Sequence, residues 1–355
     1  MIKKYQVDTK KNIFLKNKFW AIILVAQFSL FYILSKTDVA INLFSNLFEW
    51  KKNFHVLLFS KFAFSVGDVI YTFVSLYLLF TIINLLRKRS SLKLKQILIF
   101  INISYFVYQC FWGMLYFQTP IIRKLPKKEF TDQNLKNLTI KYLKLCKETR
   151  ENVSEDDNGV FIIKDLQKLK LEILLQQQNL PAQITSKTSA GILSVKPSLY
   201  NRLMNYSGIL GYYNPFTSES QYNPNLPPTQ VPFTLAHEMS HQLGFAREQE
   251  ASFIAYLCAK NSQNSDLKYS MQLYVLKSLL RNLAIKNESF VRNILSQYSV
   301  KMKKDRKNEQ EFFNNYEGIT SDIFGLTNDL FLKSNQQDGS ITYSYFITLL
   351  FLYEA

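Results

Sequence analysis

Three stretches in the first third of the chain are almost free of charged residues, and they cover residues 19–35, 62–86 and 97–117. Asp68 is the single charge among them. A helix that crosses a bilayer needs about 17–25 predominantly apolar residues, and each stretch meets that length. We therefore predict that residues 1–118 form a membrane anchor with three transmembrane helices. The expected partner of this anchor is the lipid bilayer.

The first stretch could instead be a cleaved secretory signal. Its basic leader is long, no small-x-small cleavage site follows Leu34, and two further spans come soon after, so we interpret it as a retained anchor. Lys and Arg are concentrated before the first span and between the second and third. Because such residues mark cytoplasmic loops, we expect a multi-pass protein of the inner membrane with its soluble part on the periplasmic, extracytoplasmic side. The basic run at 123–128 argues weakly for the opposite side.

Two further features belong to this anchor. Residues 39–50 read VAINLFSNLFEW, which is typical of an amphipathic helix lying on the membrane surface. Asp68 follows Gly67 near the outer end of its span. An acidic residue there either has a function inside the membrane or caps the helix at the interface, and we favour the interface.

Residues 119–355 are predicted to form a soluble domain that is largely helical. Apolar residues recur at helical spacing in 130–153 and 161–178, and the pattern is mainly helical from Phe253 onward. The apolar run 341–353 is too short to span a membrane and predicts a buried core helix.

Two segments between residues 183 and 223 favour strands. Residues 183–195 combine β-branched residues with alternation. Residues 218–223 are a candidate edge strand that could bind an extended substrate backbone, although an ordinary structural hairpin is at least as well supported. The predicted fold is thus mainly α, with transmembrane helices followed by an α+β domain that has a small sheet and many helices.

The most informative stretch is TLAHEMSHQL, which holds His237, Glu238 and His241 in the pattern HExxH. Residues four apart on a helix share one face, so both imidazoles can reach one zinc ion, and Glu238 can act on a zinc-bound water. Pro232 suits the first turn of this helix, and Gly244 suits its end. An ordinary helix with two incidental histidines is less favoured, because the chain has only 3 histidines.

A zinc site needs a third ligand. His55 lies between predicted spans, and the three cysteines form no close pair, so neither residue type completes the site. Two carboxylates follow closely, at Glu248 and Glu250, and at this spacing only one should face the metal. We favour Glu248, because the small Ala251 on its side lets the two helices approach. Glu250 is the alternative ligand, a group that orients a ligating histidine, or a solvated charge.

The chain is basic, with a formal net charge of +16. Many of its cations flank the predicted spans, where they set topology and meet anionic lipid, and the others are dispersed along helical faces. No nucleic-acid-binding motif accompanies them, so we expect no nucleic acid partner.

The segment TLAHEMSHQL resembles the zincin metallopeptidase signature. The following EQEAS resembles the segment that supplies the glutamate ligand in gluzincins, which again points to Glu248. The gap from His241 to Glu248 is far shorter than in gluzincins, and Arg247 stands where metzincins have a third histidine.

The chain as a whole resembles a family of uncharacterised, membrane-anchored zinc peptidases common in Bacteroidota. The resemblance rests on FSVGDVIY, FWGMLYFQTPI, GYYNPFTSESQ and HEMSHQLGFAREQEASFIAYL. It implies a three-span anchor and an extracytoplasmic, zincin-like catalytic domain over residues 119–355, but no particular substrate.

Three functions are compatible with these features. The first is a membrane-anchored zinc peptidase, a hydrolase in which a zinc-activated water attacks a peptide or protein substrate and Glu238 is the general base. The second is a non-catalytic, zinc-stabilised sensor or assembly module of the envelope. The third is a zinc hydrolase of cell-wall or lipid amide bonds. Glu238 favours an enzyme, since a purely structural zinc site has no need of that carboxylate.

Overall fold

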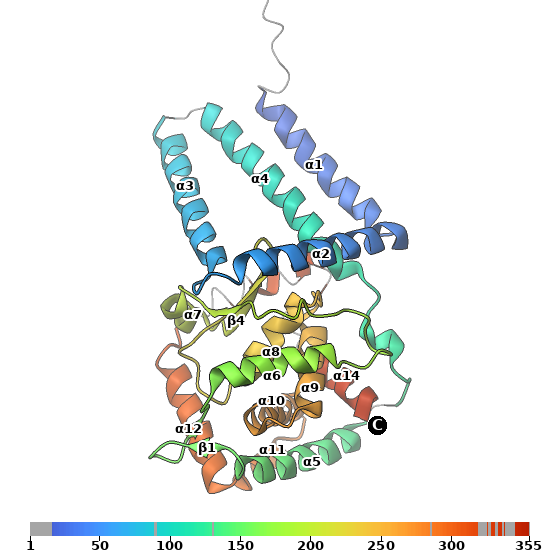
Figure 1. Ribbon diagram of the computed structural model, residues 1–355, viewed down its shortest axis with the longest axis vertical. Coiled ribbons are helices and arrows are strands. Elements are labelled where there is room, and N and C mark those ends of the chain that lie inside the picture. The colour runs from blue at the N-terminus through green and yellow to red at the C-terminus, as the bar shows by residue number, and fades with distance from the viewer. Residues whose placement is uncertain are drawn as a thin grey trace, which may run out of the picture.

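The protein is seen here in a computed structural model. It describes residues 16–88, 91–129, 131–284, 286–318, 325, 328–330, 333–335, 337 and 345–354. The described chain is mainly helical, with two small sheets. Apolar helices form one end of the molecule and a helical body forms the other (Figure 1).

Three helices at one end are long and apolar enough to cross a membrane: α1 (Asn17–Leu34), α3 (Val66–Lys88) and α4 (Ser91–Phe111). The prediction of three long apolar N-terminal helices is confirmed. A buried amide joins two of them, because Asn102 of α4 donates to the Trp20 carbonyl (3.0 Å) and accepts from Gln27 Nε2 (3.0 Å) of α1. Such bonds between apolar helices are a common source of their association in lipid.

The predicted end of the third span, at 117, is wrong. The α-helix α4 stops at Phe111, and the 3₁₀ turn η2 (Gly113–Phe117) follows it. Trp112 and Tyr116 belong instead to a buried cluster that joins the anchor to the helical body. We call this cluster the junction cluster; its members are Phe48, Trp112, Leu115, Tyr116, Tyr213 and Ala246. Apolar side chains buried against protein and those facing lipid look alike in a hydropathy pattern.

The amphipathic helix predicted at 39–50 is present as α2 (Asp38–Phe59), which crosses the ends of the three apolar helices (Figure 1). Val39, Trp50 and Phe54 are exposed on one face, whereas Phe48 and Lys51 are buried on the other. The Lys51 ammonium donates to the Pro215 carbonyl at 2.6 Å, which ties α2 to the body.

Asp68 is buried where α3 meets a sheet of the body. Its carboxylate accepts hydrogen bonds from the Leu199 amide (2.7 Å), from the Ser198 hydroxyl (3.0 Å) and from the Tyr212 hydroxyl. The expected cap is therefore wrong, because Asp68 lies within α3, its own amide donates to the Ser65 hydroxyl (3.1 Å), and its carboxylate joins α3 to the body.

Glu219 makes the reciprocal connection. Its carboxylate accepts from the amides of Val66 (3.2 Å) and Gly67 (2.7 Å), which open α3, and it pairs with Lys196 at 2.6 Å. A negative charge at a helix N-terminus is favourable, because the first amides of a helix have no partner within it. The contacts of Asp68 and of Glu219 together fix the start of α3 against the body.

The body is built mainly from nine helices in the described chain. They are α5 (Asp132–Arg150), α6 (Leu166–Gln178), α7 (Asn201–Ser207), α8 (Val231–Gln242), α9 (Glu248–Asn261), α10 (Ser265–Ala284), α11 (Glu288–Ser296), α12 (Val300–Asn314) and α14 (Tyr345–Glu354). α8 is buried along its whole length, with α9 and α10 packed against it. The buried core helix predicted at 341–353 is present as α14, while residues 341–344 lie outside the described residues.

The helix predicted at 161–178 begins later than expected, at Leu166. Phe161–Ile162 form strand β2, which pairs with β1 (Ser154–Glu155). Asp165 then caps α6, because its side chain accepts from the Lys168 amide at 2.8 Å. Aspartate at this position satisfies one of the free amides of a first turn, so the helix starts there.

The larger sheet has the strand order β3-β5-β4. β3 (Val195–Pro197) runs parallel to β5 (Glu219–Tyr222), and β4 (Gly211–Asn214) runs antiparallel to it. The strand predicted at 183–195 is correct only at its last residue. The strand predicted at 218–223 exists as β5 but is the central strand, and β4 lies at an edge of the sheet.

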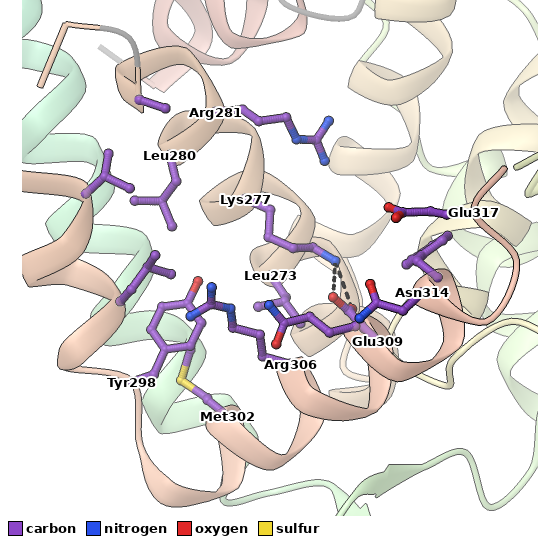
Figure 2. A pocket seen from close by; sticks show the side chains of 15 residues that line it. Leu273, Lys277, Leu280, Arg281, Tyr298, Met302, Arg306, Glu309, Asn314 and Glu317 are labelled. Atoms are coloured by element: carbon purple, nitrogen blue, oxygen red, sulfur yellow. Dashed lines mark hydrogen bonds and ion pairs between the residues drawn. The ribbon is translucent and has the colours of Figure 1, made fainter. Parts of the chain in front are cut away.

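A cavity of about 430 Å³ lies between α10, α11 and α12. Figure 2 shows Lys277 of α10 directed at Glu309 of α12, with the Lys277 Nζ 2.8 Å from a carboxylate oxygen. Lys277 and Arg281 also line a larger cavity, so α10 separates the two.

Candidate metal centre

A sharp turn after α8 brings α9 back against it. Gly244 has φ 97°, and a Cβ there would lie 2.7 Å from a ring carbon of Phe48. Only glycine adopts this backbone conformation without strain and leaves room for the ring. The turn places Glu248, the first residue of α9, opposite the histidines of α8.

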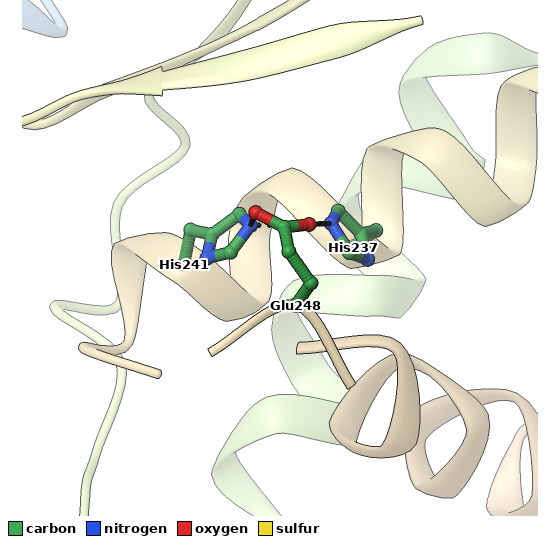
Figure 3. Close-up of side chains that lie close together, drawn as sticks. All are labelled: His237, His241 and Glu248. Atoms are coloured by element: carbon green, nitrogen blue, oxygen red, sulfur yellow. Dashed lines mark hydrogen bonds and ion pairs between the residues drawn. The ribbon is translucent and has the colours of Figure 1, made fainter. Parts of the chain in front are cut away.

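Three side chains converge in the space between α8 and α9 (Figure 3). The Glu248 carboxylate lies 3.1 Å from His237 Nε2 and 3.6 Å from His241 Nε2, and the two Nε2 atoms are 3.1 Å apart. The potential ligand atoms all lie within 4.8 Å of one another, so the group could hold a metal ion.

The outer nitrogens of both imidazoles are already engaged. His241 Nδ1 lies 2.7 Å from the Phe245 carbonyl oxygen, which can only accept, so Nδ1 carries the proton. When His241 is neutral, Nε2 therefore carries the lone pair that a metal ion could accept. His237 Nδ1 lies 3.1 Å from the Ser252 hydroxyl. Partners of this kind fix the ring orientation of metal-binding histidines.

The charges of the cluster favour a cation at its centre. Burial opposes protonation of His241, but the charge and hydrogen bond of Glu248 outweigh it and raise the His241 pKa to about 9. Burial likewise opposes ionisation of Glu248, but the histidines hold its pKa well below the usual range. Two imidazole nitrogens and one carboxylate also form a donor set that suits zinc and other divalent transition metals.

Glu238 lies on α8 between the two histidines but outside the ligand group. It is buried, and its Oε2 has no hydrogen-bond partner among the described residues. Burial raises its pKa to about 8; nearby His241 opposes this shift and Glu248 adds to it. A buried carboxyl group that stabilises no neighbour through this oxygen is available to exchange protons with a bound molecule.

Glu250 is engaged away from the cluster. Its carboxylate accepts from the Ile121 amide at 2.8 Å and pairs with Arg247 at 3.3 Å. Arg247 in turn donates to the carbonyls of Tyr116 (2.6 Å) and Gln118 (2.8 Å). Glu250 is buried, so it is not a solvated charge, and its contacts hold the segment that follows η2.

The sequence reasoning missed several residues around the centre. Ser252, behind His237, lies four residues after Glu248, and that spacing on one helix face was the available signal. The ring of Trp112 lies 5.9 Å from the ring of His241, edge to face. No sequence pattern connects Trp112 to α8, since the two are far apart in the chain.

A cavity of about 1290 Å³ contains His237, Glu238, His241 and Glu248 in its wall. Strand β4 forms part of the same wall, and a Cβ at Gly211 would lie 2.7 Å from Glu238 Cγ. The sheet is held on α8 by the Ser220 hydroxyl, which donates to the Glu238 carbonyl at 2.9 Å. The edge strand is thereby fixed directly over Glu238.

The third histidine and two of the cysteines lie elsewhere. His55 lies on α2 beside the rings of Phe59 and Phe111, outside the group of His237, His241 and Glu248. Cys146 and Cys258 are buried free thiols, so they do not form a disulfide.

Comparisons with known proteins give a family without an activity. The profile of a family described as "Protein of unknown function (DUF3810)" matches residues 44–351, which include most of the anchor and of the helical body. No curated protein and no solved structure matches the chain. The chemistry of the site is therefore the only guide to function.

Proposed function

Since the chain belongs to the DUF3810 family, whose description assigns no function, we propose from the site itself that the protein is a membrane-anchored zinc peptidase with a zincin-like domain. One observation carries the proposal. His237, His241 and Glu248 converge in a large cavity, and the buried, partly unpaired carboxyl of Glu238 lies beside them. A purely structural metal site would need neither the cavity nor Glu238.

In this proposal His237, His241 and Glu248 hold the metal. Bound zinc would supply a Lewis acid that makes water a nucleophile near neutral pH and polarises a carbonyl group. Glu238 accepts the proton of the attacking water on its unpaired Oε2 and then delivers it to the nitrogen of the leaving amine. A raised pKa suits both steps, because the carboxylate must take up a proton and release it near neutral pH.

Strand β4 supplies the substrate-binding surface in this proposal. Its pairing with β5 occupies one side, and its other side borders the cavity. An extended peptide can add to such an edge through backbone hydrogen bonds. That arrangement places a peptide bond over Glu238, beside Gly211.

The membrane assignment has a finer part that also belongs to the proposal. The Lys and Arg distribution around the three apolar helices supports an inner-membrane protein with its site on the extracytoplasmic side. A substrate would then be a peptide or protein of that compartment.

The proposal is tested with the full chain purified in detergent, a peptide library and mass spectrometry of the products. We expect peptide cleavage that a chelator abolishes and that stoichiometric zinc restores. Magnesium should not restore it, since two imidazoles are poor ligands for that ion. If zinc binds stoichiometrically and no peptide is cleaved, a non-catalytic metal-stabilised module is the better description.

A further inference from the structure

The site lies unusually close to the apolar helices. The apolar part of α4 ends at Phe111, and the next residue, Trp112, packs against His241 with ring centroids 5.9 Å apart. Trp112 also stacks near Tyr213 of β4, at 4.8 Å between centroids. A single aromatic side chain therefore separates the end of a candidate membrane span from a metal-binding histidine.

Strand β4 connects the same two places. At its start, a Cβ on Gly211 would touch the Glu238 side chain. At its end, Asn214 Nδ2 lies 2.3 Å from where a Cβ of Gly67 would be, in the first turn of α3. A strand rises about 3.3 Å per residue, so the three steps from Gly211 to Asn214 cover about 10 Å. A peptide paired with β4 would run from Glu238 to the edge of the membrane helices.

The connection between strand and helix is rigid. The Tyr212 hydroxyl of β4 donates to Asp68, and Glu219 of the adjacent strand accepts from the first amides of α3. Both carboxylates are buried, and buried charge-assisted hydrogen bonds are costly to break. The distance from the start of α3 to Glu238 is thus fixed by the fold.

The cavity changes character along its length. Its membrane side is formed by the aromatic residues Tyr71 of α3 and Tyr108 of α4, together with Trp112 and Tyr116. Its other side is formed by α10, which lies on the far side of α8 from the membrane helices (Figure 1) and contributes Lys277, Arg281 and Asn282. Aromatic side chains are favourable at a membrane interface, and charged side chains are favourable beside the part of a bound polypeptide that is in water.

We propose that the substrate is a membrane-anchored polypeptide, which the enzyme cleaves within a few residues of the bilayer surface. This inference rests on the proposed peptidase function and adds a substrate class to it. The anchored end of the substrate lies against the aromatic side of the cavity and follows the free edge of β4. The remainder of the chain leaves past α10.

The test uses the full-length, zinc-loaded protein in phosphatidylcholine vesicles. A polypeptide made of one short repeated sequence offers the same bonds at every distance from its anchor. It is linked to a diacyl lipid through its N-terminus in one series and through its C-terminus in another, and it is mixed with the lipid before reconstitution. An unlinked copy is the reference, and mass spectrometry identifies the bonds that are cut.

We expect the cuts in one of the anchored series to cluster about three to six residues from the lipid, because the strand between membrane and Glu238 covers about 10 Å. A six-residue Gly-Ser spacer next to the lipid should move the cuts along the repeat, so that they keep their distance from the membrane. Cuts in the unlinked copy should be spread along its length.

A matched pair of variants tests the aromatic side of the cavity. Tyr71 lines it, whereas Tyr77 of the same helix is half exposed and outside the lining. Tyr71→Ala should lower cleavage of the anchored substrate about three- to tenfold relative to the unlinked copy, the range expected for one aromatic contact. Tyr77→Ala should leave that ratio unchanged.

The outcomes separate the two proposals. Efficient cleavage that is scattered alike in anchored and unlinked substrates would overturn the inference and leave the peptidase function intact. Release of the lipid link in place of peptide bonds would overturn it in favour of a lipid amide hydrolase. No cleavage of any substrate by protein with zinc bound would overturn the peptidase function itself.

Discussion

Glu238 and His237 are adjacent in the chain, yet they have different roles in the proposed function. The Nε2 of His237 belongs to the group of ligand atoms, whereas the Glu238 carboxyl has an oxygen without a partner among the described residues. Metal binding and proton transfer should therefore be separable by mutation.

We predict that Glu238→Gln keeps stoichiometric zinc and loses peptide hydrolysis, because the amide has nearly the same shape but cannot accept the proton. Loss of a general base costs about 10²–10⁴-fold in rate. His237→Ala should lose both zinc and activity. Elemental analysis of the metal beside turnover of a cleaved peptide checks the pair, and unchanged turnover of Glu238→Gln would refute the assigned role.

Gly244 tests the turn that brings Glu248 to the histidines. Its φ of 97° is unfavourable for other residues, and a side chain would also meet Phe48. Gly208 is a matched control, since it has φ 71° but nothing within 4 Å of its Cβ position. We expect Gly244→Ala to cost about 2–4 kcal/mol and Gly208→Ala about 1 kcal/mol, the cost of backbone strain alone. Thermal unfolding in detergent measures both, and equal losses would contradict the packing argument.

At this scale the sequence predicted the group of His237, His241 and Glu248 better than the surroundings of that group. The spacing of His237 and His241 follows from helix periodicity, and the turn at Gly244 explains why Glu248 and not Glu250 reaches them. Trp112 and Gly211 were not predicted as neighbours of the site. Their positions depend on how distant segments pack, and no local pattern carries that information.

Among the helices and strands, too, some predictions were correct and others were wrong. Long helices such as α5 and α10 were expected, because apolar residues repeat along them at helical spacing. The edge position predicted for 218–223 was wrong, because the parallel pairing of β5 with β3 makes β5 a central strand. The structural hairpin given as the alternative is present and is formed by β4 and β5. The end of α4 was also misplaced, because the burial of Trp112 in the junction cluster cannot be distinguished from burial in lipid by composition.

Mutation of Asp68 tests how α3 is attached to the sheet of the body. We predict that Asp68→Ala destabilises the protein by about 2–4 kcal/mol, because it removes a buried carboxylate that accepts from Ser198, Leu199 and Tyr212. Thr81→Ala is the control on the same helix: the Thr81 side chain is buried, but its hydroxyl donates only to the Tyr77 carbonyl of its own helix.

Thermal unfolding in one detergent compares the two variants. A loss of stability in Asp68→Ala no larger than that in Thr81→Ala would show that the buried contacts of Asp68 do not fasten α3 to the sheet.

For the whole molecule, the family profile runs across the boundary predicted at 118, from residue 44 to residue 351. The contacts have the same continuity, since α2 and the junction cluster bind the anchor to the body. The anchor is thus part of the structure that holds the site, and not only a tether. A soluble fragment that begins at 119 would lack Trp112, Tyr116 and the two amides of α3 that Glu219 binds.

The side of the membrane on which this assembly works is the last prediction. Lys and Arg are abundant before α1 and over residues 87–95, where α3 ends and α4 begins, and the positive-inside rule assigns both regions to the cytoplasm. Three spans then put the helical body outside it. A reporter active only in the cytoplasm should be active when fused within residues 87–95, where α3 ends and α4 begins, and inactive after Gln118, and a periplasmic reporter should give the opposite pattern. Because the basic run at 123–128 favours the other orientation, its replacement by neutral residues should leave the pattern unchanged. Cytoplasmic activity of the Gln118 fusion would reverse the topology and move the candidate substrates to the cytoplasmic face of the membrane.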